Sequence, residues 1–206
     1  MKVLVLGANG KTGGHVVDGA LAAGHEVTVL IRDPAKFNKP GVRVLTGDAT
    51  KSADVTAAVR GQDAVIDSIG GTTPYKSTTL ETTAARNVID AMKTEGARRI
   101  IAVSMAGIGE SRAQVPLWYK YLLMPTFLHG STNDKTNMEQ AIQTSGLQYV
   151  IVRPPILKDT PATGSIRILG PGEIGHTITR ADLAAFLVDQ LDSTVNLGKA
   201  VTIANN

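Results

Sequence analysis

The chain is 206 residues long, with 43% hydrophobic and 19% charged residues and a formal net charge of +3, which fits one globular domain with a full core. It has no cysteine, which excludes disulfides, thiolate zinc sites and thiol catalysis. Lys and Arg never form runs longer than two, and the sequence shows neither a signal peptide nor an 18-residue apolar run, so we expect a cytoplasmic protein that binds neither nucleic acid nor membrane.

Short β-branched runs alternate with longer stretches of helical period. The runs expected to form strands are residues 2–7, 26–32, 42–48, 64–70, 99–105 and 149–155. Most are apolar at consecutive positions, as strands buried on both faces of a sheet are. Helical spacing lies between them, over residues 11–23, 52–60, 80–94 and 136–145. This order predicts an α/β fold, a doubly wound parallel sheet of the Rossmann-like type.

The last third of the chain departs from this repeat. Residues 163–178 contain short apolar pieces punctuated by Gly and Pro, which indicates small strands or loops. Thr179, followed three residues later by Asp182, is typical of a capping box that opens a closing helix, and residues 199–205 could add a final strand. Residues 1–206 therefore read as a single domain with small C-terminal elements on the substrate side.

The first strand runs into a glycine-rich turn with Gly7, Gly10 and Gly13. In a doubly wound sheet, the turn between the first strand and the first helix is the usual phosphate seat, because the helix N-terminus offers unpaired N–H donors and a partial positive charge. The alternative is that the glycines only make a tight turn. Strand, turn and helix stand in the order that a dinucleotide site requires.

Cations surround this turn. An NAD site usually has an acid at the end of the second strand, whereas here Arg32 stands there, with Lys36 one helical turn on and Lys11 inside the glycine turn. The three could converge on a 2′-phosphate, to which the planar fork of arginine is suited, and this favours NADP(H). Asp33 is the counter-argument, since it would be the ribose acid if the strand ended one residue later. Lys36 could also be a solvated surface charge.

Several motifs together resemble those of the atypical short-chain dehydrogenase/reductases. The motifs are "GANGKTGGHV", "VLIRDPAK", "GDAT", "GQDAVIDSIG", "ARNVIDAMKTEGARRIIAVS" and "SGLQYVIVRPP". The chain is most similar to the biliverdin reductase B and flavin reductase group and to the NmrA-like proteins, in register over most of residues 1–160. The resemblance implies an NADP(H) site.

The resemblance also implies roles for particular residues. The pyrophosphate and 2′-phosphate positions are Gly7, Asn9, Gly10, Lys11, Thr12, Gly13, Arg32 and Lys36. Asp48 and Ala49 match the loop on the adenine side, and Ser68, Ile69 and Gly70 match the loop under the cofactor ribose. Ser104 stands where relatives place a serine that faces the nicotinamide, and Pro154 and Pro155 stand beside the nicotinamide ring.

Departures from the family pattern bear on the chemistry. No tyrosine has a lysine four residues on, so the YxxxK pair of ordinary short-chain dehydrogenases is missing. Two histidines of the biliverdin reductase B group are replaced, by Ile156 after the double proline and by Lys135. Ser104 and Lys135 are the candidate catalytic residues. Alternatively, Ser104 only satisfies backbone groups at a strand end, and Lys135 is a surface cation at a helix start.

Four of the eight aromatic residues fall between positions 118 and 127: Trp118, Tyr119, Tyr121 and Phe127. We expect Trp118 and Tyr119, with Ile156, to contact a flat acceptor. The alternative is an ordinary amphipathic helix packed on the sheet edge, or a dimer contact. The four histidines are not spaced as metal ligands, and no metal is expected.

These observations predict an oxidoreductase in which NADPH passes hydride to a small, planar acceptor, namely a flavin, quinone or tetrapyrrole. Orientation and proximity would supply most of the rate, because no strong acid–base group is evident. The alternative is a non-catalytic NADP(H)-binding redox sensor or assembly factor of the NmrA-like type. The protein is expected to be a monomer or a weak homodimer.

Overall fold

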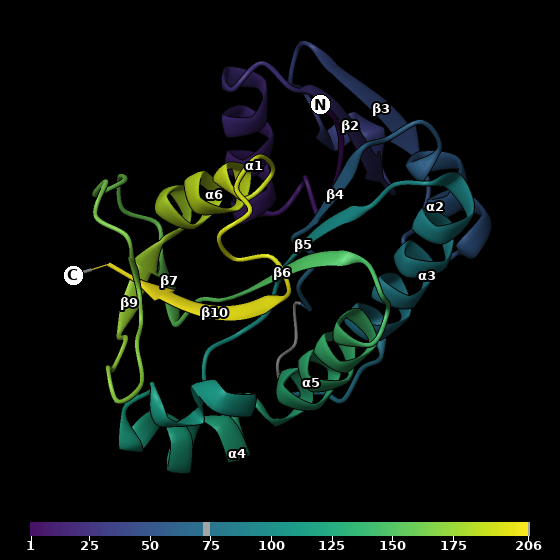
Figure 1. Cartoon of the computed structure of the whole chain (residues 1–206). Coiled ribbons are helices and arrows are strands. Elements are labelled where there is room, and N and C mark those ends of the chain that lie inside the picture. Colours follow the sequence, from purple (N-terminus) through teal and green to yellow (C-terminus); the bar gives the residue numbers. More distant parts are fainter. Residues whose placement is uncertain (72–74, 206) are drawn as a thin grey trace.

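The computed structural model describes residues 1–71 and 75–205 and has an eight-stranded central sheet (Figure 1). The strand order is β3-β2-β1-β4-β5-β6-β10-β8, which contains the doubly wound order 3-2-1-4-5-6. All neighbours are parallel except β8, which is antiparallel to β10. The strands are β1 (Lys2–Leu6), β2 (Glu26–Ile31), β3 (Val42–Thr46), β4 (Ala64–Asp67), β5 (Arg99–Val103), β6 (Gln148–Arg153), β8 (Arg167–Ile168) and β10 (Lys199–Ala204). The predicted fold class is confirmed.

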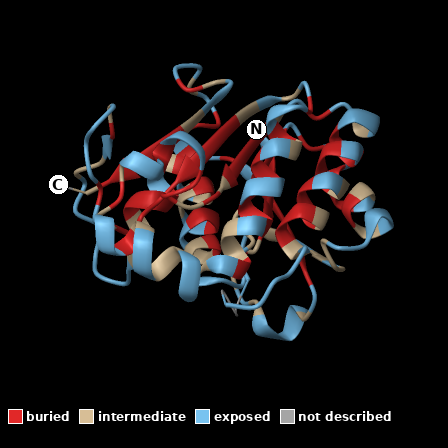
Figure 2. Ribbon diagram, turned by 90° about the horizontal axis from the view of Figure 1, so that it is seen from below, coloured by how far each residue is buried: buried red, intermediate tan, exposed pale blue. Residues whose placement is uncertain are grey.

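Helices cover both faces of the sheet (Figure 1). One face carries α1 (Lys11–Ala22) and α6 (Arg180–Asp189), which pack against each other. The other face carries α2 (Ser52–Val59), α3 (Leu80–Glu95) and α5 (His129–Gln143). The strands between these layers are buried along their length, and each helix exposes only its outer side (Figure 2).

The consecutive apolar pattern of the strands follows from this arrangement. Val3 and Val5 of β1 pack into the core under α1 and α6, whereas Leu4 and Leu6 pack into the core under α2, α3 and α5. All four side chains are fully buried. A central strand whose two faces are both covered by helices has no side that faces solvent, so polar and apolar residues do not alternate along it.

Several strands end earlier than the sequence predicts, at the edge where the carboxyl ends lie. β4 ends at Asp67 rather than at residue 70, because the Ile69 N–H bonds to the Asp67 Oδ1 atom, at 2.9 Å, instead of to a neighbouring strand. β6 ends at Arg153, since Pro154 and Pro155 have no N–H to donate. The polar strand ends therefore leave the sheet at this edge and form loops there.

The C-terminal third adds a second, two-stranded sheet of β7 (Ile156–Lys158) and β9 (Thr177–Thr179). Thr179 caps α6 as predicted, since the Asp182 N–H donates to the Thr179 Oγ1 atom at 3.0 Å, whereas the Thr179 N–H donates to Asn205 Oδ1 at 2.8 Å and not to Asp182. Burial alone would raise the pKa of Asp182, but hydrogen bonds from Thr163, Thr179 and Gly164 outweigh it and lower the pKa to about 2. This carboxylate thus joins the start of α6 to the preceding loop.

Candidate cofactor and acceptor site

The glycine turn joins β1 to α1 with two close backbone approaches. The Gly10 N–H donates to the Gly7 carbonyl at 2.8 Å. A Cβ atom on Gly13 would lie 2.1 Å from the Gly7 oxygen, and one on Gly7 would lie 2.7 Å from the backbone of Ser68. Gly7 also has a φ of +75°, which disfavours any side chain. The turn therefore packs against the loop after β4 and needs glycine at both positions.

The N-terminus of α1 is open to an anion. Its N-cap is Gly10, no side chain caps it, and its first turn has no acidic residue. Asn9, Gly10 and Lys11 are exposed, and Thr12 is partly exposed. A helix start with uncapped N–H groups is a ready anion site, suited to a pyrophosphate.

The three cations expected near a 2′-phosphate differ in their partners. The Lys11 ammonium lies 2.5 Å from Asp159, which also pairs with Arg180, and these two cations hold the pKa of Asp159 below its usual range. The Lys36 ammonium lies 3.1 Å from Asp33. Arg32 is exposed and has no ion pair within the part of the chain that the structure describes. Of the three, Arg32 is thus the cation with no carboxylate at ion-pair distance among the described residues.

The Asp33 carboxylate is used in the short turn that follows β2. β2 ends at Ile31, one residue before the predicted end, and Asp33 caps the short 3₁₀ helix η1 (Pro34–Lys36) by accepting from the Ala35 N–H at 3.2 Å. The condition for a ribose acid at Asp33, a strand ending one residue later, is therefore not met. Arg32 stays a prediction for the phosphate contact.

The loop after β3 lies close to Arg32. The Asp48 carboxylate accepts from the Thr50 N–H and hydroxyl at 2.9 and 2.8 Å. These bonds are the main cause of the lowered pKa of Asp48, and the charge of Arg32 contributes to it. The Ala49 carbonyl accepts from Asn87 Nδ2 at 3.0 Å. The two predicted adenine-side residues, Asp48 and Ala49, are thus held in place by hydrogen bonds from Thr50 and Asn87.

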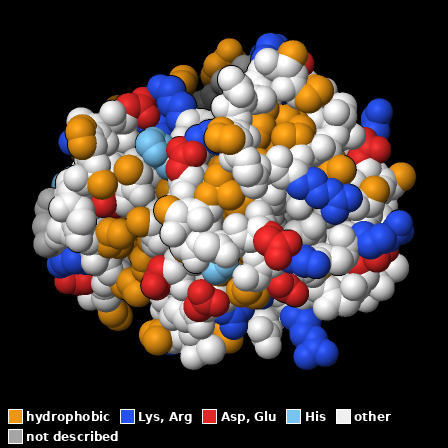
Figure 3. Space-filling model, turned by 90° about the horizontal axis from the view of Figure 1, so that it is seen from above, with side chains coloured by type: hydrophobic (Ala, Val, Ile, Leu, Met, Phe, Trp, Pro, Cys, Tyr) orange, Lys and Arg blue, Asp and Glu red, His pale blue; other side chains and the backbone are white. Residues whose placement is uncertain are grey.

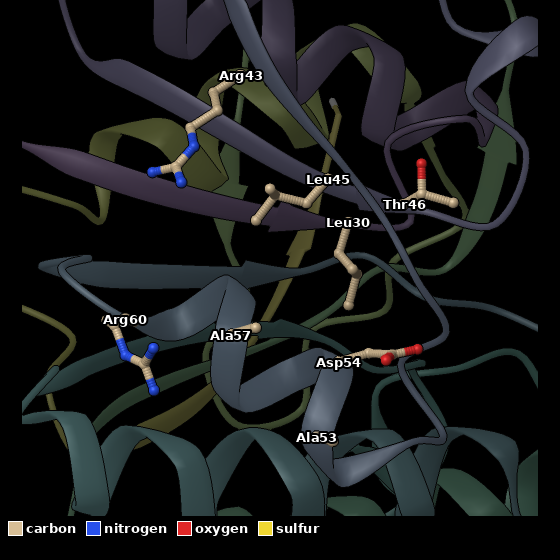
Figure 4. A pocket seen from close by; sticks show the side chains of 8 residues that line it. All are labelled: Leu30, Arg43, Leu45, Thr46, Ala53, Asp54, Ala57 and Arg60. Atoms are coloured by element: carbon tan, nitrogen blue, oxygen red, sulfur yellow. The ribbon is translucent and has the colours of Figure 1, made fainter.

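A groove of about 490 Å³ runs between β2, β3 and α2 (Figure 4). It is lined by Leu30, Arg43, Leu45, Thr46, Ala53, Asp54, Ala57 and Arg60, none of which the sequence singled out. Asp54 links it to the loop after β3, because its carboxylate accepts from the Asp48 N–H at 2.9 Å. The groove therefore adjoins the adenine-side loop but does not contain the glycine turn.

The loop after β4, residues 68–71, is called the strand-end loop below. Its start lies against β1, since the Ser68 hydroxyl donates to the Leu6 carbonyl at 2.7 Å. Lys135 contacts this loop: its ammonium donates to the Ile69 carbonyl at 3.1 Å and to the Val103 carbonyl at 2.7 Å. Only 6% of Lys135 is exposed, so the alternative that it is a surface cation is wrong. The loop and the end of β5 are neighbours.

Ser104 follows directly after β5. It is 4% exposed, its N–H donates to the Val152 carbonyl at 2.8 Å, and its hydroxyl oxygen has no hydrogen-bond partner among the residues described. The alternative that this hydroxyl satisfies backbone groups is therefore wrong for this structure. Pro154 and Pro155, which follow β6, are also buried, and the Pro154 carbonyl accepts from the Ala106 N–H at 2.9 Å. The ends of β5 and β6 thus stay paired beyond the sheet.

Asp67, at the end of β4, is buried, and its Oδ2 atom has no partner within the described ranges. Burial raises its pKa from 3.8 to about 6, and Glu81 adds to this effect, whereas the Ile69 N–H and Lys135 oppose it. Between about pH 4 and about pH 6, Asp67 holds a proton in the folded state that it has lost in the unfolded chain. Stability therefore falls as the pH rises from about 4 to about 6.

Replacing Asp67 by Asn is expected to remove this fall in stability, which amounts to about 3 kcal/mol at 1.36 kcal/mol per pKa unit. Asparagine keeps the acceptor for Ile69 but carries no charge. Urea unfolding at pH 4 and pH 8 gives the difference for each protein, and Asp90→Asn, at an exposed position of α3, is the control. Equal pH dependence in Asp67→Asn and the parent chain would contradict the prediction.

The aromatic segment, residues 117–128, is helical over most of its length but irregular. It contains a π-helical turn, η3 (Tyr119–Leu123), followed by the short α4 (Met124–Thr126). Tyr119 is buried with Ala106 and Val115, and this burial raises its pKa to about 12. The outer surface of the segment carries large exposed side chains, namely Leu117, Trp118, Tyr121, Leu122 and Phe127. Trp118 stays a candidate acceptor contact, as does Ile156, which is 39% exposed.

A buried arginine that the sequence reading missed ties this region to the sheet. Arg153, at the end of β6, makes a two-pronged contact with Glu139 of α5 at 2.9 and 2.6 Å. It also pairs with Glu110 at 2.8 Å, in the 3₁₀ helix η2 (Gly109–Ala113) that precedes the aromatic segment, and thereby lowers the pKa of Glu110. No local pattern marks these partners, because they come from three different elements.

The described ranges offer no sign of a metal centre or of a membrane span. There, no group of three or more His, Asp or Glu side chains is placed to hold a metal ion. None of the helices seen there is long and apolar enough to cross a bilayer. On the face shown in Figure 3, Lys and Arg side chains stand apart from one another, with acidic residues between them.

A doubly wound sheet with an open glycine turn at its first strand defines the class as a Rossmann-like nucleotide-binding domain. A family model described as NAD(P)H-binding matches residues 7–194. The chain belongs to this NAD(P)H-binding family, and NAD(P)H is its cofactor. The resemblance drawn from the motifs is thereby confirmed.

Known proteins of similar sequence or structure include reductases and an epimerase. The structure of ChuY, described as an anaerobillin reductase from Escherichia coli O157:H7, superposes with a TM-score of 0.83 at 30% identity, over 100% of this chain and 97% of that one. The uncharacterised sugar epimerase YhfK of Bacillus subtilis is 30% identical over 200 residues, which cover 93% of this chain and 88% of that protein. An uncharacterised chloroplastic protein of Arabidopsis thaliana is 32% identical over 179 residues, 80% of this chain but only 62% of its own length.

Proposed function

We propose that this protein is an NADPH-dependent reductase that transfers hydride to a planar conjugated acceptor, such as a flavin, quinone or tetrapyrrole. The observation that carries the proposal is the Ser104 hydroxyl, which is buried and without a partner in the described structure at the end of β5. A buried hydroxyl that bonds to nothing costs free energy unless something else completes it. A nicotinamide or acceptor oxygen at this strand end would do so.

NADPH supplies the hydride when it is bound, and the residues of this chain hold it in place. The uncapped start of α1 would take the pyrophosphate, and Arg32 the 2′-phosphate. The strand-end loop and Pro154 would border the ribose and the nicotinamide. With the cofactor held in this way, its reactive end would lie beside Ser104, at the carboxyl edge of the sheet, where ligands of doubly wound folds bind.

The acceptor side favours a flat, conjugated molecule. Exposed Trp118 and Ile156 offer apolar surface on which a ring system can stack. No tyrosine is placed for the usual proton transfer, since burial raises rather than lowers the pKa of Tyr119 and the YxxxK pair is missing. A conjugated acceptor needs no such acid, because it can take hydride by stacking and a proton from water. That ChuY is described as a reductase of anaerobillin is consistent with this class of acceptor.

Replacing Ser104 by Ala is expected to lower kcat about tenfold, the equivalent of one neutral hydrogen bond. NADPH consumption is followed at the absorbance band of the reduced nicotinamide, with a panel of flavins, quinones and linear tetrapyrroles. Ser52→Ala, at the exposed start of α2, is the matched control and should retain the parent rate. Unchanged turnover in Ser104→Ala would remove this residue from the proposal.

A second candidate is a non-catalytic NADP(H)-binding redox sensor or assembly factor, which the missing YxxxK pair favours. It predicts tight binding of NADPH with no consumption by any member of the panel. Steady oxidation of NADPH by one acceptor class rejects this candidate. The same preparation gives the oligomeric state by light scattering, with a monomer or weak dimer expected.

A further inference from the structure

Two consecutive residues of α5, Asp134 and Lys135, contact the elements that follow β4. The Asp134 carboxylate accepts from the Thr78 hydroxyl at 2.9 Å, from the Glu81 N–H at 3.0 Å, and from the N–H and hydroxyl of Thr82 at 2.9 and 2.6 Å. The N-cap residue of α3, Thr79, makes no side-chain cap of its own. Asp134 therefore caps α3 from another helix, which satisfies orphan N–H groups of its first turn.

The buried Lys135 ammonium is held by three contacts, two hydrogen bonds to backbone carbonyls and one ion pair. Besides the carbonyls of Ile69 and Val103, its third contact is the Glu81 carboxylate at 3.3 Å. The same Glu81 oxygen accepts from the Gly71 N–H at 3.1 Å. Lys135 and Glu81 are 6% and 3% exposed. Two of the three N–H groups of the ammonium therefore bond to backbone carbonyls, and the ammonium is buried beside its counter-ion.

A buried ion pair is seldom justified by stability alone. The cost of removing both charges from water is similar to the gain from their attraction, and apolar side chains of the same volume often do as well. This pair does something that apolar residues cannot do: it satisfies backbone groups of the strand-end loop and at the end of β5. The contact set consequently fixes where two neighbouring strand ends lie relative to each other.

We propose that Glu81, Asp134 and Lys135 form a clamp that positions the strand-end loop and Ser104 for the cofactor. Lys135 is a positioning residue, which acts through the backbone of Ile69 and Val103 and does not touch the acceptor. The effect on NADPH rests on the proposed function, whereas the effect on the loop does not. Because α5 begins directly after the aromatic segment, the clamp also joins the cofactor side of the site to the acceptor side.

The test compares Lys135→Met with the double variant that carries both Glu81→Gln and Lys135→Met. The single variant leaves a buried carboxylate unpaired and is expected to unfold at a lower temperature. The double variant removes both charges of the pair, and the new amide side chain at position 81 can still accept from Gly71, so this variant should recover most of the lost melting temperature. Both lack the donor to Ile69 and Val103. Lys93→Met, at an exposed position in the last turn of α3, is the control.

We expect the double variant to bind NADPH about tenfold more weakly than the parent chain in calorimetry at a temperature where both are folded. Recovery of parent affinity together with stability would overturn the proposal, because Lys135 would then only neutralise Glu81. Amide hydrogen exchange without cofactor provides a second readout. The amides of Ile69, Gly70 and Gly71 should exchange at least tenfold faster in the double variant, with β1 and α6 unchanged.

These readouts separate the two proposals. A parent chain that fails to bind NADPH defeats the proposed function, and the exchange rates of the strand-end loop still decide the clamp. Unchanged exchange at those three amides defeats the clamp, whatever the cofactor result is.

Discussion

Replacing Gly13 by Ala is expected to abolish NADPH binding within the measurable range and to lower the melting temperature. The added Cβ atom would lie 2.1 Å from the Gly7 oxygen, 2.6 Å from the Gly7 carbonyl carbon and 2.9 Å from the Ala8 Cα atom. All three are backbone atoms, so α1 must move away from β1 to accept the methyl group. That movement displaces the helix start that is proposed to hold the pyrophosphate. Calorimetric titration with NADPH, with thermal unfolding of the same sample, measures both effects.

Gly14 offers a matched control one residue further along α1. A Cβ atom there would find nothing closer than the Ala8 oxygen at 3.9 Å, and alanine favours a helix interior by about 1 kcal/mol over glycine. Gly14→Ala should therefore keep NADPH affinity and unfold at the same or a higher temperature. Parent-like NADPH affinity in Gly13→Ala would show that the close approach of α1 to the turn is not needed for binding.

Replacing Arg32 by Ala should weaken NADPH binding about 10- to 150-fold and leave NADH binding within about threefold of the parent value. Hydrogen bonds to charged groups contribute about 1.5–3 kcal/mol, and the lost contact serves only the 2′-phosphate. Arg32 is the best placed of the three predicted cations, since Lys11 and Lys36 pair with Asp159 and Asp33. The ratio of the two dissociation constants, measured at one salt concentration, is the quantity that tests the assignment.

Arg43 provides the comparison for Arg32. It is an exposed cation of β3 that lines the groove beside α2, and Arg43→Ala should weaken both coenzymes little and equally. Equal loss of NADPH and NADH in Arg32→Ala would reject the 2′-phosphate role.

The sequence alone was sufficient for the architecture and for the position of the glycine turn that is proposed to hold phosphate. Consecutive apolar runs separated by helical periods predict a parallel sheet covered on both faces, and the glycine spacing marks the first turn. The N-cap of α6 at Thr179 was likewise predictable. Each of these features depends on residues close together in the chain, where steric and hydrogen-bonding rules act locally.

The conformation of the aromatic segment could not be predicted from local sequence rules. The sequence left open whether it forms an amphipathic helix, and the structure makes a π-helical turn that exposes Trp118 and buries Tyr119. The start of α5 at His129, seven residues before the predicted start, has the same origin. Tertiary contacts override propensity in such segments, because packing contributes more than the small differences in intrinsic preference.

Only the tertiary structure decided which charged groups meet. Lys135 lies 66 residues from Ile69 in the chain, and Lys11 lies 148 residues from Asp159. A sequence states that a lysine is present but not whether its ammonium faces water or two backbone carbonyls. That choice depends on long-range packing, which removes water from one site and leaves it at another, and the cost of burying a charge makes the difference decisive.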